Sequence, residues 1–352
     1  MANMDIKTDP VVSFFSLWSY ASDELINPTT DRVFSFSELL KTFSSENIPL
    51  LEKTVPSIEN LSVEEKIQLM KNFTRLSSDV CAGRYNSGEN LIDDMVDIFQ
   101  LNGEDKKNLT KAYESYKKFY DLNKKEIMKS KSALSLAYSE WKASDYFDKM
   151  YSFFQVDESK KMNFYLHHFP KKLMDSGYST SECIHQNISL NRDEPEANYF
   201  KDTCILTRRM LTPIHEFGHF LFENSQSSKD AVGKPKSSAN KLFQHLEKYF
   251  EGQNKKSPKS FAYAIIHEAF ADSCGLFFKE TKDPTFNPMD MKKINSNFKE
   301  VDGLTRIVYP IFKEYMQQNK PISNTFFNQV LNSSEFKKTF PVQKPIVFSK
   351  QR

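Results

Sequence analysis

The sequence predicts an α+β protein that is mostly helical. Only 9 of its 352 residues are glycine, which is well below average usage and argues against turn-rich all-β folds. Apolar residues recur at helical spacing over most of the chain, whereas one short apolar stretch, Ile184 to Leu190, is typical of a strand. The length is enough for one large domain or two smaller ones with a buried core.

The first 155 residues are predicted to be helical. A capping-box pattern, Ser62 followed by Glu65, indicates a helix that begins there and runs to Leu76. The helical spacing continues over three further segments, 91–101, 109–128 and 132–154. We expect 109–128, which is rich in Tyr and Lys, to be a long surface helix. Because this region contains no histidine and no recognisable chemistry, we interpret it as a scaffold or substrate-recognition region.

The second half of the chain is predicted to alternate helices with polar loops. Two strong helical patterns cover 203–224 and 258–280. The stretch between them, 225–259, is polar and loop-like except for a helix near 241–250. A further helix is expected near 304–318.

Composition and charge argue against several classes of function. Lys and Arg number 48 and Asp and Glu number 46, so the net charge of +2 gives no electrostatic reason to expect nucleic acid or an acidic membrane as a partner. No GxGxxG loop is present, and the segment from Gly83 to Gly88 lacks the Lys and Ser/Thr that a phosphate-binding loop needs. No apolar stretch reaches the roughly 18 residues of a membrane span.

The N-terminus and the cysteines bear on where the protein acts. The segment MANMDIKTDPVVSFFSLWSY has neither the basic start nor the long apolar core of a signal peptide. No CxxC pair is present, and we expect reduced thiols at all four cysteines, Cys81, Cys183, Cys204 and Cys274. We therefore expect a cytoplasmic protein, or one exported without a cleaved signal, such as a bacterial effector.

The most informative segment is HEFGH at 215–219. Residues four apart lie on one face of a helix, so the imidazoles of His215 and His219 can bind one ion. Glu216 is rotated by about 100° from His215, which lets it reach a metal-bound water rather than the metal itself. This is the HExxH arrangement of zinc peptidases, with two nitrogen ligands and one general base.

Pro213 leaves two alternatives for the helix that carries this motif. Either Thr212 caps a helix that starts at Pro213, or an earlier helix from about Thr203 is kinked there. Both alternatives leave the two histidines at the same spacing.

A second motif, AIIHEAFADSCG, occupies residues 264–275. It is similar to the string that thermolysin-like peptidases carry after their HExxH helix, which reads Asn-Glu-Ala-Phe-Ser/Ala-Asp with a Gly three residues later. Only the Asn is replaced, by His267. The two similar stretches are a small part of the chain, but motif identity, order and helical context agree. The chain therefore resembles zinc peptidases of the gluzincin group, whose third ligand is a Glu on a second helix.

The resemblance implies one Zn²⁺ per chain, with His215, His219 and Glu268 as ligands and a fourth position for water. Asp272, one turn beyond Glu268, would hold the other ring nitrogen of His215. His267 is offset by about 100° from this face and is expected to cap, hydrogen-bond or line the pocket rather than bind the metal. Close approach of the two helices is expected at three small residues, Ala264, Ala271 and Gly275.

The sequence departs from thermolysin itself in two respects. First, 48 residues separate His219 from Glu268, many more than in thermolysin, and this insertion could shape the cleft or recognise substrate. Second, no His follows His267, so the later His that stabilises the oxyanion in thermolysin-like enzymes is missing.

Related gluzincins use a Tyr in place of that later His. Tyr309 is the first candidate here, and Tyr263 and Tyr315 are others. Arg306, close to Tyr309 in the sequence, could grip a substrate carbonyl.

These patterns predict a zincin-like metallopeptidase domain at 156–352 behind the helical region 1–155. The expected reaction is hydrolysis of peptide bonds in protein or peptide substrates, with Zn²⁺ polarising the scissile carbonyl and Glu216 as general base. Tyr309 would stabilise the oxyanion. Residues 184–190 lie where zinc peptidases have an edge strand that pairs with extended substrate.

Two alternatives from other classes remain open. One is a catalytically inactive zincin-fold scaffold that binds a protein partner, although such a scaffold has no use for Glu216. The other is a structural or regulatory metal-binding protein, in which a fourth ligand such as His267 or His185 closes the site.

Overall fold

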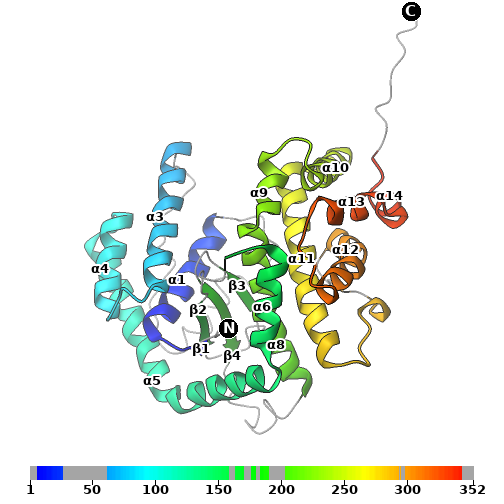
Figure 1. Ribbon diagram of the computed structural model, residues 1–352. Coiled ribbons are helices and arrows are strands. Elements are labelled where there is room, and N and C mark those ends of the chain that lie inside the picture. Colours follow the sequence, from blue (N-terminus) through cyan, green and yellow to red (C-terminus); the bar gives the residue numbers. More distant parts are fainter. Residues whose placement is uncertain are drawn as a thin grey trace, which may run out of the picture. The chain divides into compact units, whose positions relative to one another are not determined.

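The computed structural model describes residues 6–26, 62–157, 163–169, 176–179, 183–189, 203–292, 294 and 298–342. Helices predominate in this part of the chain and its strands form one sheet, so the predicted α+β, mostly helical class is confirmed (Figure 1). The chain forms two compact units. We call them the sheet unit, residues 3–140 and 161–213, and the helical unit, residues 141–160 and 214–352 together with Met1 and Ala2.

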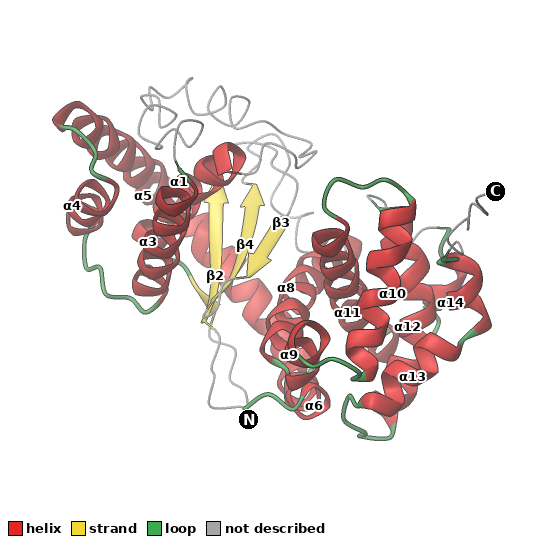
Figure 2. Ribbon diagram, turned by 90° about the horizontal axis from the view of Figure 1, so that it is seen from above, coloured by secondary structure: helices red, strands yellow, loops and turns green. Residues whose placement is uncertain are grey.

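The sheet unit combines helices with one four-stranded sheet. Its elements in chain order are β1 (Ile6–Lys7), α1 (Pro10–Ile26), α3 (Val63–Cys81), α4 (Gly88–Phe99), α5 (Gly103–Glu140), β2 (Asn163–Phe169), β3 (Ser176–Ser179) and β4 (Cys183–Ser189). The strands lie in the order β1-β2-β4-β3, and β2 is parallel to both β1 and β4. β3 is antiparallel to β4, and the arrows of these two strands point in opposite directions in Figure 2. The predicted strand corresponds to β4, except that Leu190 lies outside the described residues.

β4 is an interior strand. It pairs with β2 on one side and with β3 on the other, so the hydrogen-bonding groups of its backbone are already engaged on both sides. The prediction of an edge strand at 184–190 that is open to an extended substrate is therefore wrong. Neither β2 nor β3 was predicted from the sequence, and without them the position of β4 in the sheet could not be inferred.

Local sequence explains how the long helices of the sheet unit begin and end. At the start of α3, Ser62 Oγ accepts a hydrogen bond from the Glu65 amide, and the Glu65 carboxylate accepts one from the Ser62 amide, which confirms the capping box. α5 ends at Glu140, and Lys142, whose φ is 49°, interrupts the helical conformation before α6 (Ala143–Phe154). The predicted helix at 132–154 is therefore two helices, the end of α5 and α6.

Residues 109–128 lie within one long helix whose exposed face carries the lysines, so the prediction of a long surface helix is confirmed. Its other face is buried. Within that range the buried side chains recur every three or four residues, at Leu109, Ala112, Tyr113, Tyr116, Phe119, Tyr120 and Ile127. The Tyr116 hydroxyl donates a hydrogen bond to the carbonyl oxygen of His168 on β2, at 3.2 Å. The tyrosines of α5 thus support the sheet instead of facing solvent.

Aromatic side chains of α1 form the centre of the core of the sheet unit. The ring of Trp18, which is fully buried, stacks on Phe73 of α3 with centroids 5.8 Å apart and lies 5.0 Å from the ring of Phe99 on α4. Phe14 meets Tyr113 of α5 edge to face at 5.3 Å. Each such buried ring stabilises the fold by about 1.5–3 kcal/mol.

The helical unit is built around α11 (Pro258–Lys282), which packs against α10 and α12 (Figures 1 and 2). Its other elements are α6, the second half of α8 (Thr203–Asn224), α9 (Gln226–Gly233), α10 (Ser238–Gly252), the 3-10 helix η2 (Pro288–Asp290), α12 (Lys299–Gln317), α13 (Asn324–Asn332) and α14 (Ser334–Thr339). Stacked and edge-to-face rings join them: Phe270 of α11 lies 4.5 Å from Phe222 of α8, and Phe153 of α6 lies 4.7 Å from Phe312 of α12.

The predicted helices of the second half of the chain are confirmed, with small changes at their ends. α8 runs from Thr203 through Pro213 to Asn224, so the helix does not start at Pro213 and the first alternative is excluded. α9 was not predicted, because QSSKDAVG has the polar composition of a loop. Its N-terminus is capped by Ser225, whose Oγ accepts a hydrogen bond from the Ser228 amide at 3.1 Å.

The compact units do not follow the predicted boundary between residues 155 and 156. α6 belongs with the helical unit because its aromatic side chains pack there, as Phe153 does on α12. β2 and β4 belong with the N-terminal helices because β2 pairs with β1 and packs against α1. The pairing of Ile6 with Phe164 spans most of the N-terminal half of the chain, and periodicity carries no information about such a contact.

Two further observations concern disulfides and membranes. Cys81, Cys183 and Cys274 carry reduced thiols, as predicted, and the side chain of Cys204 lies outside the described residues. Among the described helices, none is both long enough and apolar enough to cross a membrane.

Gly218 allows α8 and α11 to approach each other closely. A Cβ atom at this position would lie 2.9 Å from the Ala271 Cα and 3.1 Å from the Cys274 Sγ. Ala271 is therefore at the contact, as predicted, but Gly275 is not, because a Cβ there would meet nothing within 4 Å. Ala264 is exposed and also lies away from the contact. The residue that permits the approach is thus inside the HExxH motif.

We expect Gly218→Ala to lower the free energy of unfolding by about 1–3 kcal/mol, because the new methyl group meets the backbone of α11. Gly275→Ala is the matched control, since it should be neutral or stabilise the helix by up to about 1 kcal/mol. Urea unfolding of both variants tests this. Equal stability of the two variants would contradict the close contact at Gly218.

Candidate metal centre

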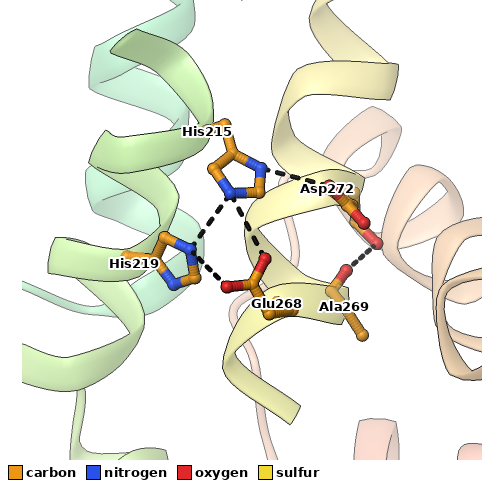
Figure 3. Close-up of polar contacts among 6 residues, drawn as sticks. His215, His219, Glu268, Ala269 and Asp272 are labelled. Atoms are coloured by element: carbon orange, nitrogen blue, oxygen red, sulfur yellow. Dashed lines mark hydrogen bonds and ion pairs between the residues drawn. The ribbon is translucent and has the colours of Figure 1, made fainter. Parts of the chain in front are cut away.

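His215 and His219 project from one face of α8 toward α11 (Figure 3). Another face of the same helical segment is apolar and buried, at Ile214, Phe217 and Leu221. The Phe217 ring meets Phe147 of α6 edge to face, with centroids 4.9 Å apart. This packing fixes the rotation of α8 about its axis, and so directs both imidazoles to the same place.

Glu268 and Asp272 project from α11 toward these histidines, one turn apart (Figure 3). The rest of α11 near them is held by buried side chains at Ile265, Ile266, Ala269, Phe270 and Ala271. The structure thus brings together four residues that the sequence analysis singled out, although 48 residues separate His219 from Glu268.

The three ligand atoms form a small triangle. His215 Nε2 lies 3.1 Å from His219 Nε2 and 3.5 Å from Glu268 Oε2, and His219 Nε2 lies 3.6 Å from Glu268 Oε1. Two ligands of a tetrahedral zinc ion with bonds of about 2.0–2.1 Å are about 3.3 Å apart. The triangle therefore has the size that such an ion requires, and this group is one that could hold a metal.

The side chains that form the triangle are partly exposed. The side chains of His215, His219 and Glu268 are 25%, 17% and 35% exposed. Asp272 Oδ1 lies 3.1 Å from His215 Nδ1, on the far side of the ring from the triangle. A carboxylate at this nitrogen holds the ring in place and leaves Nε2 for an ion, as is common for histidine ligands.

The electrostatics of the group favour a bound cation. Burial acts to lower the pKa of His215, but hydrogen bonds to Asp272 and Glu268 outweigh it and raise the pKa well above the usual range. Burial and the charge of His215 lower the pKa of His219 to about 3. Burial opposes the ionisation of Glu268, yet the hydrogen bond and charge of His215 lower its pKa. The positive charge of His215 is therefore held between the carboxylates of Glu268 and Asp272. A metal ion bound at the triangle would replace the proton that carries this charge.

Glu216 lies beside the triangle and is buried, with 9% of its surface exposed. Burial raises its pKa to about 7, the positive charge of His215 acts to lower it, and the Glu268 carboxylate adds to the rise. A carboxylate with a pKa near neutrality can both accept and return a proton, which is what a general base needs.

His267 lies next to the triangle but is not part of it. Its ring stacks near His219 with centroids 6.0 Å apart, meets Phe222 at 4.8 Å and lies 4.2 Å from the ring of Tyr263. Burial lowers its pKa to about 4, so the ring is neutral near pH 7. Among the described residues, the potential ligand group at this place comprises three side chains and does not include His267.

Tyr309 is not brought to the triangle. Its hydroxyl donates a hydrogen bond to Glu280, which also accepts one from Lys313 Nζ at 2.6 Å. Glu280 lies twelve residues beyond Glu268 on α11, which is a rise of about 18 Å along a helix. Burial and the hydrogen bond to Glu280 raise the pKa of Tyr309. The Tyr309 hydroxyl is therefore hydrogen-bonded to Glu280 and does not lie at the candidate metal centre.

Arg306 is also engaged elsewhere. Its Nε donates to Asp302 Oδ2 at 3.0 Å, and its terminal nitrogens donate to the carbonyl oxygens of Met289 and Met291 at 3.4 Å and 2.6 Å. The guanidinium therefore ties the segment before α12 to that helix. Of the two other tyrosines considered, Tyr315 is buried against Phe326, and Tyr263 contacts His267 beside the triangle.

Comparisons of the chain with protein-family models, with curated proteins and with solved structures find no match. The functional interpretation therefore rests on the residues and the geometry of the site.

A second group with metal-ligand chemistry was missed by the sequence analysis. Cys81, Cys183 and His185 lie together in the sheet unit. The available signal was the spacing of Cys183 and His185, which are two apart, but the predicted strand began only at Ile184; both residues lie on the observed strand β4 and so share a face. Cys81 gave no signal, because α3 reaches β4 only in the tertiary structure.

We expect Glu268→Ala to lower the number of zinc ions bound per chain by one, because it removes one corner of the triangle. Asp272→Asn should lower the affinity for that ion by about 10–100-fold, since it removes no ligand and changes only the carboxylate that orients His215. His267→Ala is the control and should keep the ion. The zinc content of the three variants after equilibrium dialysis tests these expectations. Retention of this zinc ion in Glu268→Ala, or its loss in His267→Ala, would contradict the assignment of the ligands.

We expect Tyr309→Phe to lower the free energy of unfolding by about 1–2 kcal/mol, because Glu280 loses a hydrogen bond from a part-buried partner. Zinc affinity should not change. Tyr315→Phe, at a position whose ring packs against Phe326, is the control for removing a hydroxyl. A loss of zinc affinity in Tyr309→Phe at unchanged stability would place its hydroxyl at the metal centre after all.

Proposed function

We propose that the protein is a zinc-dependent peptidase of the gluzincin group that hydrolyses peptide bonds in protein or peptide substrates. The observation that carries this proposal is the triangle of His215, His219 and Glu268, with Asp272 behind His215. The ligand types, their order in the chain and the helices that present them agree with the two motifs in the sequence. The presence of both motif helices in the helical unit supports a zincin-like catalytic region there.

When bound, Zn²⁺ would supply Lewis acidity, which polarises a carbonyl and makes water a nucleophile near neutral pH. His215, His219 and Glu268 hold the ion, and Asp272 orients His215. Glu216 accepts the proton of the attacking water and returns it to the leaving amine; its pKa, raised by burial, suits both steps.

The three-ligand group favours an enzyme over a structural metal site. Structural zinc sites usually have four protein ligands, whereas catalytic sites keep one position for water or substrate. The group at this place has three ligands among the described residues, and its side chains are partly exposed. A catalytically inactive scaffold would have no need for a buried Glu216, because burying a carboxylate costs stability.

We expect Glu216→Gln to lower peptide hydrolysis by about 10²–10⁴-fold, because the amide cannot accept a proton, and to leave zinc bound. Glu223→Gln is the matched control, since Glu223 is an exposed carboxylate on the same helix. The assay uses zinc-loaded protein and a complex mixture of peptides, with new termini detected by mass spectrometry.

The outcome of this assay decides between a peptidase and a catalytically inactive scaffold, and it tests Glu216 as the general base. Cleavage by wild type and by Glu223→Gln, but not by Glu216→Gln, supports the peptidase. Absence of cleavage by the zinc-loaded wild type would favour the inactive scaffold. Equal cleavage by wild type and Glu216→Gln would exclude Glu216 as the base.

A further inference from the structure

Cys81, Cys183 and His185 form a buried group in the sheet unit. Their ligand atoms, two Sγ and one imidazole nitrogen, all lie within 4.8 Å of one another. The three residues are 2%, 0% and 2% exposed. Cys81 is the last residue of α3, and Cys183 and His185 point to the same face of β4, so the group joins a helix end to the middle of the sheet.

One distance in the group can be compared directly with a zinc site. Cys81 Sγ lies 3.6 Å from His185 Nε2. A sulfur and a nitrogen that share a tetrahedral zinc ion, with bonds of about 2.3 Å and 2.0 Å, are about 3.5 Å apart. The observed separation fits two ligands of one ion, and in the absence of an ion it is that of a hydrogen bond between the thiol and the imidazole.

The other nitrogen of His185 is held as in a metal site. His185 Nδ1 lies 2.8 Å from His167 Nε2, and His167 Nδ1 lies 2.9 Å from Ser13 Oγ. When each Nδ1–H donates along this chain, Nε2 of His185 carries no proton and faces Cys81, which is the state that a metal ligand requires.

Cys81 is also held at its backbone. Its carbonyl oxygen accepts hydrogen bonds from Asn163 Nδ2 at 3.3 Å and from the Tyr165 hydroxyl at 3.4 Å. Both donors belong to β2, and the Tyr165 ring also stacks near His185 with centroids 6.0 Å apart. The end of α3 is therefore fixed against the strand next to the one that carries the other two ligands.

We propose that Cys81, Cys183 and His185 bind one Zn²⁺ ion that joins the end of α3 to the sheet. The charges favour this ion: two thiolates and a neutral imidazole balance Zn²⁺ to zero, and a neutral group can be buried without the cost of an uncompensated charge. A monovalent soft ion such as Cu⁺ would leave a buried negative charge. Three protein ligands leave one position of a tetrahedral ion for a small ligand such as water.

This site is independent of the proposed peptidase site. It lies in the other compact unit, uses thiolates, and shares no residue with the triangle of His215, His219 and Glu268. The ion would stabilise the folded sheet unit, because the site exists only in the folded state. The full chain is thus expected to bind two zinc ions.

Cobalt substitution of the full-length protein distinguishes the two sites. The protein is purified with a reductant, stripped of metal with a chelator and titrated with Co²⁺. Thiolate ligands give a sulfur-to-cobalt charge-transfer absorption in the near ultraviolet, whereas a site of two imidazoles and a carboxylate cannot. We expect this absorption in the wild type and in Glu268→Ala.

Cysteine variants test the ligands themselves. Cys81→Ser and Cys183→Ser should each lose the sulfur-to-cobalt absorption, and the zinc content should fall from two ions to one. Cys274→Ser is the matched control, because it removes a buried cysteine of the helical unit and should keep both signals. If a ligand variant does not fold, the wild type still tests the site. Bound zinc should protect the thiols of Cys81 and Cys183 from a thiol reagent, and removal of zinc by a chelator should make both thiols reactive.

Three results would overturn the proposal. The first is a reduced wild type that shows no sulfur-to-cobalt absorption. The second is retention of that absorption in both Cys81→Ser and Cys183→Ser. The third is a Cys81–Cys183 disulfide found by mass spectrometry, with no zinc uptake after reduction, which would make the pair a redox element instead.

Discussion

The contact between α8 and α11 at Gly218 is the constraint on which the metal centre depends. Because no side chain stands between Gly218 and the Ala271 backbone, the two helices approach closely enough for a glutamate on one to reach two histidines on the other. Packing on the other faces, such as Phe217 on Phe147, keeps α8 from rotating away. The separations of the ligand atoms thus follow from helix packing.

The charged side chains at this contact favour a bound cation. Two carboxylates, Glu268 and Asp272, lie on opposite sides of His215 and hold a positive charge there. Burying two carboxylates is costly unless positive charge compensates them, and a metal ion supplies it more completely than a shared proton. Burial also raises the pKa of Glu216, beside these residues, to about 7.

The two groups of potential metal ligands have different surroundings, and these suggest different roles. The triangle on α8 and α11 is partly exposed and consists of nitrogen and oxygen ligands, which suits exchange of water and substrate. The group of Cys81, Cys183 and His185 is almost fully buried and contains two sulfur ligands, which suits a permanent ion that holds elements together. Aromatic cores in each unit keep the corresponding helices and strands in place.

The sequence by itself determined what is local. The spacing of His215 and His219 placed both on one face of a helix, the pattern of Ser62 and Glu65 placed a capping box, and the apolar run near Ile184 placed a strand. Tertiary structure decided what is distant in the chain: the meeting of Glu268 with the histidines, the partner of Tyr309 and the interior position of β4. Periodicity reports which face of an element is apolar, but not which element that face meets. That choice depends on how all the buried faces fit together at once.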